Sequence, residues 1–225
     1  MNAGAIILGV VIIVLCYILY IFITKQDTYI LSSSKDISGG FQPQNSNTYV
    51  PTANTFAYGI WVYVGNWDDK DKTILTMISD SRKNSLSIGL EKKNPILFVN
   101  FGSNTGGNVS VMNNFPLQKW VYIIVSVDNQ YLDVYIDGKL VRSILLQNSV
   151  IMYNNNTDNN SLSIKAGPCN NTIITYFNVW LASAVDPGTA WKYYMKGNGQ
   201  SSVTGYGANL QIVQNNAVQG TYQLF

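Results

Sequence analysis

The chain has 225 residues, and only 12% of them are charged, with 14 Lys and Arg against 12 Asp and Glu. The formal net charge of +2 gives a field too weak to recruit nucleic acid by charge alone. The absence of histidine excludes Ser-His-Asp and Cys-His catalytic sites and histidine zinc ligands. Glu91 is the only glutamate, so the glutamate pair of many glycoside hydrolases is missing. We therefore expect a protein that is not an enzyme and has no nucleic-acid partner.

The N-terminal segment is an uncharged apolar run over residues 3–24. At 1.5 Å per residue, a helix of this length measures about 33 Å, which matches the hydrocarbon core of a bilayer. The run lacks the basic start, the shorter apolar core and the cleavage site of a signal peptide. We therefore predict a single-pass transmembrane anchor over residues 1–25. Lys25 is the nearest basic residue, and it favours a domain on the cytoplasmic side.

Residues 26–54 are rich in Ser, Gln, Asn, Gly and Pro and are predicted to be a linker that leads into the domain. A sandwich domain is then predicted over residues 55–197, because nine short β-type runs follow one another with turn residues between them. These runs are residues 55–64, 73–79, 85–90, 95–101, 120–127, 131–136, 140–146, 161–166 and 173–181. The polar tail, residues 198–225, holds two faint β-like pieces. It is predicted to complete a sheet edge or to reach a neighbouring subunit.

Two short sequence patterns predict the local structure more specifically. Asp137-Gly138 separates two β-type runs and predicts a hairpin with a two-residue type I′ turn, which requires positive φ angles. After the last strand, Asp186 can cap a short helix, Pro187 suits its first position and Gly197 can end it.

The acidic cluster of Asp68, Asp69 and Asp71 provides oxygen ligands of the kind that calcium prefers. Lys70 lies within the cluster, and the spacing fits no EF-hand. A solvated turn is therefore the favoured interpretation, and a calcium site is the alternative.

Five tryptophans suggest aromatic binding surfaces, because indole rings stack on sugars and anchor protein interfaces. Trp61, Trp120 and Trp180 lie in predicted strands and are expected in the core. Trp67 on a loop and Trp191 in the short helix are the candidates for glycan or partner binding, although core packing remains the simpler interpretation.

Four asparagines begin N-x-S/T sequons, which are modified only in a glycosylating compartment. They are Asn108, Asn155, Asn159 and Asn170. The two cysteines predict no disulfide, because Cys16 lies in the apolar run. Cys169 is expected to be a structural thiol in a reducing compartment.

The strand order over residues 50–197 resembles the laminin-G-like, concanavalin A-like lectin/glucanase jelly roll. The most specific part is Trp120 with the Tyr-x-Asp-Gly-Lys run at 135–139, although Val121-Tyr122 replaces the His-His pair frequent after this tryptophan. The resemblance implies an all-β, antiparallel jelly-roll sandwich. It does not imply glucanase activity, because the catalytic strand with two glutamates has no counterpart. The lectin branch implies glycan binding through loops, often with calcium.

The layout as a whole is similar to membrane-anchored minor capsid proteins of large DNA viruses with an internal lipid membrane. We therefore expect a non-enzymatic protein of the internal virion membrane whose domain faces the capsid and ties membrane to shell subunits. The alternative is a lectin-like protein that is anchored in a membrane, such as the cell membrane, and binds glycans.

Overall fold

The computed structural model describes residues 9–17, 29–44, 49, 51, 53–70, 72–78, 86–101, 107–146, 163–199, 209–214 and 217–223, the last two ranges through their backbone only. The strands are β1 (Tyr29–Leu31), β2 (Lys35–Asp36), β3 (Thr55–Val64), β4 (Lys72–Ile78), β5 (Leu86–Leu90), β6 (Leu97–Phe101), β7 (Asn108–Met112), β8 (Trp120–Asp128), β9 (Tyr131–Ile136), β10 (Lys139–Leu145), β11 (Ser163–Ala166), β12 (Thr172–Trp180), β13 (Asn209–Gln214) and β14 (Ala217–Gln223), and helix α2 is Pro187–Met195.

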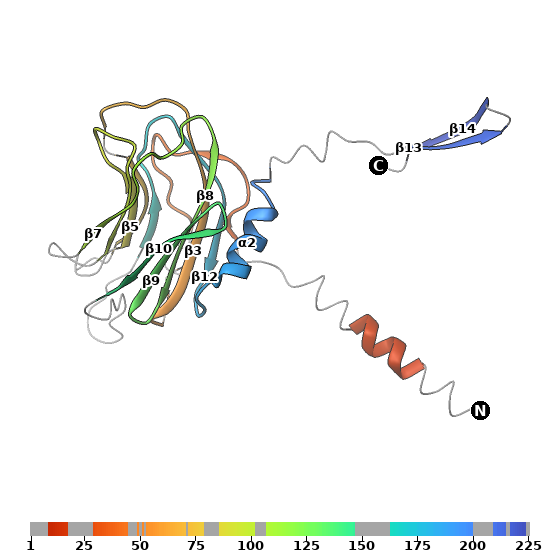
Figure 1. Cartoon of the computed structure of the whole chain (residues 1–225), viewed down its shortest axis with the longest axis horizontal. Coiled ribbons are helices and arrows are strands. Elements are labelled where there is room, and N and C mark those ends of the chain that lie inside the picture. The colour runs from red at the N-terminus through yellow and green to blue at the C-terminus, as the bar shows by residue number, and fades with distance from the viewer. Residues whose placement is uncertain are drawn as a thin grey trace.

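Two antiparallel sheets face each other in the body of the molecule (Figure 1). The seven-stranded sheet has the order β1-β12-β3-β8-β9-β10, with β2 also paired to β12. The five-stranded sheet has the order β11-β4-β5-β6-β7. Helix α2 lies on the outer side of the seven-stranded sheet, away from the other sheet. The predicted all-β antiparallel sandwich is therefore confirmed.

All nine predicted strands are present, and three further strands join them in the sandwich. Strands β1 and β2 lie within the predicted linker and pair with β12, so part of that linker belongs to the seven-stranded sheet. Strand β7 pairs with β6. Strands β1 and β2 have three and two residues, fewer than the four over which apolar alternation marks a strand in sequence. Strand β7 has five residues and was not among the predicted runs.

The main core fills the space between the two sheets. Side chains alternate between the two faces of a strand, so every second residue of the central strands points inward. Ile60 and Val125 from one sheet and Ile88 and Val99 from the other are all 0% exposed. Complete burial of such a side chain stabilises the fold by about 1.5–3 kcal/mol, so this layer holds the sheets together.

A second apolar cluster lies on the outer face of the seven-stranded sheet, under α2. Trp61 is 6% exposed, and its ring stacks between Tyr122 of β8 and Tyr194 of α2, at centroid distances of 5.0 and 5.6 Å. Trp120 and Trp180 pack against the same cluster and are partly buried. The tryptophans expected in the core are therefore packed, but in this outer cluster and not between the sheets.

The predicted ends of helix α2 are confirmed. The Asp186 carboxylate accepts hydrogen bonds from the backbone N–H groups of Gly188 and Thr189, at 2.8 and 3.1 Å, and Pro187 is the first helical residue. These bonds satisfy donors that the first turn of a helix leaves free. Gly197 follows with a φ of +74°, which ends the helix.

The predicted hairpin is also confirmed. Asp137 and Gly138 have φ values of +49° and +76°, and Lys139 pairs directly with Ile136 across a two-residue loop. The Asp137 carboxylate also accepts a hydrogen bond of 2.9 Å from the backbone N–H of Tyr122, so the turn is tied to β8. The pairing register of β9 with β10 is thus fixed at the turn by its backbone conformation and by this bond.

The two terminal segments are described only in part. Residues 9–17 are helical with exposed apolar side chains, and most of the predicted anchor lies outside the described residues. Within the described part of the chain, none of the helices has the length and apolar character needed to cross a membrane. In the tail, β13 and β14 pair with each other as a separate two-stranded sheet.

Candidate functional site

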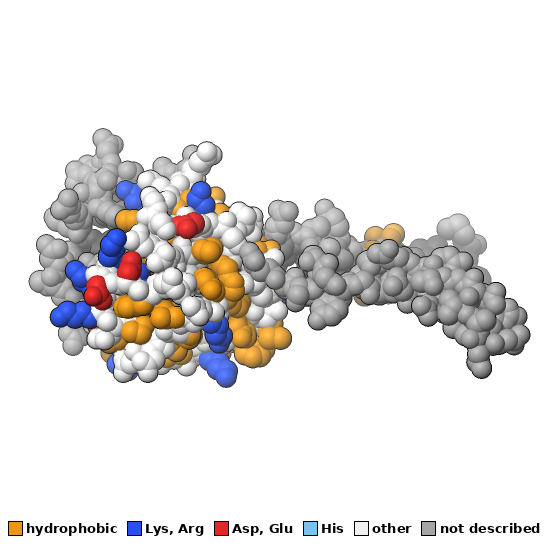
Figure 2. Space-filling model, turned by 90° about the horizontal axis from the view of Figure 1, so that it is seen from above, with side chains coloured by type: hydrophobic (Ala, Val, Ile, Leu, Met, Phe, Trp, Pro, Cys, Tyr) orange, Lys and Arg blue, Asp and Glu red, His pale blue; other side chains and the backbone are white. Residues whose placement is uncertain are grey.

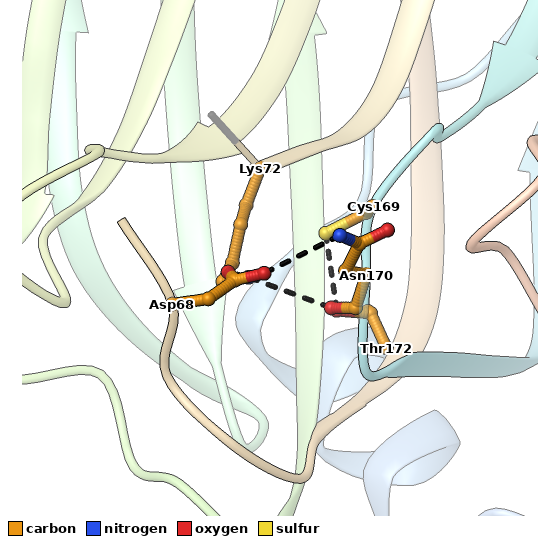
Figure 3. A network of polar contacts seen from close by, with 5 residues as sticks. All are labelled: Asp68, Lys72, Cys169, Asn170 and Thr172. Carbon is orange, nitrogen blue, oxygen red and sulfur yellow. Dashed lines mark hydrogen bonds and ion pairs between the residues drawn. The ribbon is translucent and has the colours of Figure 1, made fainter. Parts of the chain in front are cut away.

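A polar cluster surrounds a buried lysine at the start of β4 (Figure 3). The Lys72 side chain is 0% exposed, and its ammonium group forms an ion pair with Asp68. The same ammonium donates to the backbone carbonyl of Asn170 at 3.4 Å, and the Asn170 amide donates to the second Asp68 oxygen at 3.4 Å. A buried charge requires such partners, because its desolvation is costly. The cluster therefore joins the β3–β4 loop to the segment before β12.

Two titratable groups of this cluster have shifted pKa values. The hydrogen bond from Lys72 lowers the pKa of the Asp68 carboxyl below its usual value. Burial raises the pKa of the Cys169 thiol, whose Sγ lies 3.0 Å from Oγ1 of Thr172. A raised pKa keeps the thiol protonated near neutral pH, and the protonated form is a poor nucleophile. The cluster is thus arranged as a structural contact.

The predicted calcium ligands are divided by this arrangement. Both carboxylate oxygens of Asp68 contact nitrogen donors, Asp69 is exposed and Asp71 lies outside the described residues. The part of the chain that the structure describes contains no group of three His, Cys, Asp or Glu side chains that could hold a metal. Lys72 supplies the positive charge that a calcium ion would bring to Asp68. The calcium site stays a prediction.

The two candidate tryptophans lie in different environments. Trp67 is partly buried against the main core, and its ring lies 5.4 Å from the Lys72 ammonium. Trp191 of α2 is 46% exposed, but its ring also packs against the turn at Gly138. Trp67 therefore belongs to the packing around Lys72, whereas Trp191 keeps nearly half of its surface available to a partner.

The outer face of the five-stranded sheet carries a row of polar side chains that sequence reasoning did not identify. The strand registers place one residue from each strand directly opposite the next, in a line across the sheet. The row consists of Lys165, Thr76, Ser87, Asn100 and Asn108. Each is half-buried or exposed, whereas its neighbours in sequence on the central strands face the core. We call this line the polar row.

An aromatic ring lies next to the polar row. Phe98 of β6 is half-buried, and it occupies the same outer face two residues from Asn100. It is paired with Gly89, where an added Cβ would lie only 2.7 Å from the Phe98 ring. The ring therefore lies over a position that only glycine leaves open, and this contact holds it against the sheet.

An open hollow of about 610 Å³ adjoins this surface and shares Phe98 and Asn108 with it. Its lining residues are Lys72, Thr73, Leu90, Glu91, Lys92, Lys93, Asn94, Phe98 and Asn108. The space-filling view shows lysine or arginine and acidic side chains at several places on the visible face, some of them close together at its left edge, with apolar side chains exposed between them (Figure 2). The outer face of the five-stranded sheet thus combines hydroxyl, amide, aromatic and charged groups.

Two of the predicted sequons fall on described residues. Asn108 is exposed and belongs to the polar row, so a glycan attached there would cover this surface. The Asn170 amide donates to Asp68, and Thr172 of the same sequon is 0% exposed. Asn155 and Asn159 lie outside the described residues.

The comparison with known families gives one match. The family model described as "Concanavalin A-like lectin/glucanases superfamily" matches residues 38–184. No curated protein sequence matches the chain.

Solved structures similar to this chain include binding domains of botulinum neurotoxins. The binding domain of serotype G is 14% identical, has a TM-score of 0.51 and aligns over 70% of this chain and 40% of its own. The binding domain of neurotoxin DC in complex with rat synaptotagmin II is 15% identical, with a TM-score of 0.52 over 70% and 39%. The same domain in complex with SialylT is 16% identical, with a TM-score of 0.50 over 78% and 41%. This chain therefore spans about 40% of the length of these structures, and the likeness shows the fold.

Proposed function

The chain belongs to the concanavalin A-like lectin/glucanases superfamily, and we propose that its sandwich is a non-catalytic domain that binds glycans. The observation that carries this proposal is the polar row beside Phe98 on the outer face of the five-stranded sheet. This surface is open, whereas α2 covers much of the outer face of the other sheet.

The chemistry of this surface matches that of a sugar. Sugar hydroxyls donate and accept hydrogen bonds, as do the hydroxyls of Thr76 and Ser87 and the amides of Asn100 and Asn108. The apolar face of a sugar ring stacks on an aromatic side chain, and Phe98 offers such a ring beside the amides. Because the strands hold these groups in line, little conformational freedom is lost on binding.

The non-catalytic part of the proposal follows from the residues that hydrolysis would need. Paired carboxyl groups perform most glycoside hydrolysis, one as the acid and one as the base or nucleophile. Glu91 is the single acid among the described residues that line the hollow. Its carboxyl group can contact a sugar hydroxyl, but within this described lining it has no second carboxyl group to complete the acid–base pair.

The comparisons support the coarser part of the proposal, a binding module. The similar toxin structures are described as binding domains, one in complex with SialylT and another with rat synaptotagmin II. The specific ligand of this chain is proposed from its own polar row and Phe98.

The proposal is tested with the full chain in mild detergent on a glycan array, followed by titration calorimetry with the best ligand. Phe98→Ala should weaken binding about tenfold or more, because it removes the stacking ring. Tyr131→Ala is the matched control, since Tyr131 is an exposed aromatic residue on the other sheet. Binding that survives Phe98→Ala and fails after Tyr131→Ala would place the site elsewhere, and no binding to any glycan would refute the proposal.

The apolar segment at the N-terminus supports a second proposal, attachment to a membrane. Residues 9–17 form a helix whose large apolar side chains are about half exposed or more, for example Ile12 at 52% and Ile13 at 69%. Lipid around this segment would remove that apolar surface from water. Retention of the chain in the membrane fraction after carbonate washing tests the attachment, and release into the aqueous fraction would refute it.

A link between the internal virion membrane and capsid or shell subunits is a finer form of the same proposal. Tethered glycan binding ranks above it, because the described residues provide a surface suited to a sugar. A shell-linking role would instead require a partner that binds the full chain with an affinity unchanged by Phe98→Ala.

A further inference from the structure

We infer that the glycan bound by this domain is acidic, carrying a carboxylate or sulfate group that lies in the hollow between the β5–β6 turn and the start of β4. This inference rests on the proposed glycan-binding function and names the class of ligand. Its starting point is that the hollow and the polar row share Phe98 and Asn108. A saccharide bound along the row therefore extends into the hollow.

The hollow presents more positive than negative charge to solvent. Lys92 and Lys93 line it from the β5–β6 turn, and both are exposed. Glu91 is the single acidic residue in the described lining, so these two lysines and one glutamate leave one positive charge. Lys72 also lines the hollow, but its ammonium is buried and paired with Asp68. Lys165 adds a further exposed positive charge at the far end of the polar row.

The two lysines of the turn have no charged partner within the described part of the chain. The ion pairs there join Lys72 to Asp68 and Lys119 to Asp137, so neither Lys92 nor Lys93 is neutralised by Glu91 or by another carboxylate. Their ammonium groups are thus available to a ligand. Ammonium groups bind carboxylate and sulfate oxygens through charge-assisted hydrogen bonds, which are stronger than those between neutral groups.

The position of Phe98 makes a sugar the preferred carrier of this acidic group. Phe98 lines the same hollow as the two lysines, and its ring lies over Gly89. An inorganic anion would use the lysines alone. A saccharide uses the ring, the amides of the row and the lysines together, and these are the groups that the hollow and the row combine.

The inference is tested by comparing matched acidic and neutral ligands with the full chain in mild detergent. The pairs are 3′-sialyllactose with lactose and 3′-sulfolactose with lactose, so the first tests carboxylate recognition and the second tests sulfate recognition against the same neutral sugar. We expect the acidic member of at least one pair to bind about five- to tenfold tighter, the size expected for two exposed charge pairs. Lys92→Gln with Lys93→Gln should abolish that difference and leave the affinity for the neutral member unchanged.

The matched control is Lys139→Gln with Arg142→Gln, which removes the same charge from exposed positions on β10 of the other sheet. It should leave the preference for the acidic member intact. Equal affinity for neutral and acidic members would overturn the inference while the proposed function stands. Absence of binding to any glycan would refute the proposed function itself. Inorganic polyphosphate bound as tightly as the acidic saccharides, with the same lysine dependence, would show a general anion site and also overturn the inference.

Discussion

The outer faces of the two sheets differ in chemistry and in cover. On the seven-stranded sheet, aromatic side chains such as Trp61 and Tyr122 are buried beneath α2. On the five-stranded sheet, Phe98 and the residues of the polar row are half-buried or exposed. The comparison shows that the same alternating strand pattern gives a buried aromatic layer where a helix covers the sheet and a polar surface where α2 does not, and it is on this second face that we propose recognition.

Specific hydrogen bonds hold helix α2 in place over the seven-stranded sheet. The Tyr135 hydroxyl donates to the backbone carbonyl of Val185 at 2.9 Å, and the Val185 N–H donates to the hydroxyl of Ser126 at 2.8 Å. Val185 directly precedes the N-cap residue Asp186. The sheet therefore fixes the position at which the helix begins, and burial of the aromatic cluster follows.

The largest effect is expected for Trp61→Ala on the covered face. The mutation removes a side chain that stacks on both Tyr122 and Tyr194 and leaves a cavity between sheet and helix. We expect the free energy of unfolding to fall by about 3–5 kcal/mol, measured by urea denaturation. Trp61→Phe is the control and should lose less, because it keeps a ring in the stack. A loss below about 1 kcal/mol for Trp61→Ala would mean that the covered face contributes little to stability.

The next effect is expected for Gly138→Val, at the turn beneath the helix. A Cβ at this position would lie 3.0 Å from side-chain atoms of Trp191 and Tyr194, and the φ of +76° is unfavourable for a β-branched residue. We expect a loss of about 2–3 kcal/mol, with a change in tryptophan fluorescence as the helix shifts. Gly39→Ala is the control, since no atom lies within 4 Å of its added Cβ and its φ is ordinary. Equal losses for both variants would argue against the contact.

The sequence predicted well those features that depend on residues close to one another in the chain. The Asp137-Gly138 turn and the cap at Asp186 depend on local backbone conformation and local hydrogen bonds, and both are confirmed. The two-residue strand β2 was missed because its hydrogen-bond partner, β12, lies more than 130 residues away in sequence.

The polar row could not be predicted for a related reason. Thr76, Ser87 and Asn100 are unremarkable in their own strands, and only the register between the strands aligns them. The sequence also could not predict which sheet α2 would cover. Alternation distinguishes the two faces of a strand, but it does not identify what packs on either face. Gly89 paired with Phe98 was the one available sign, since glycine inside a strand often permits a close approach.

Acid pH should loosen the covered face through the helix cap. Hydrogen bonds from Thr189 lower the pKa of Asp186, so the folded state binds its proton less readily than the unfolded state does. The cap therefore stabilises the fold above the unfolded carboxyl pKa of about 4, and this contribution is lost as pH falls through the lower folded value.

The measurement is the urea midpoint between pH 6 and pH 2. Asp186→Asn is the matched variant, because Asn is an equally good cap but does not titrate. In this variant the urea midpoint should fall less between pH 6 and pH 2. The part of the fall that is due to Asp68, whose pKa is also lowered, should remain. An identical decline in Asp186→Asn would exclude the cap as a source of the pH dependence.

The smallest effect on stability is expected for Phe98→Ala on the open face. Phe98 is half-buried, and its ring contacts the backbone position of Gly89 without being enclosed between two layers as Trp61 is. Its removal deletes apolar surface that is already partly in water, so we expect a loss of about 1 kcal/mol or less by urea denaturation. Glycan affinity should nevertheless fall about tenfold. Phe98→Ala should therefore affect binding more than stability, whereas Trp61→Ala should affect stability more than binding. A stability loss for Phe98→Ala as large as that for Trp61→Ala would mean that the open face also serves packing, and any loss of binding would then report unfolding.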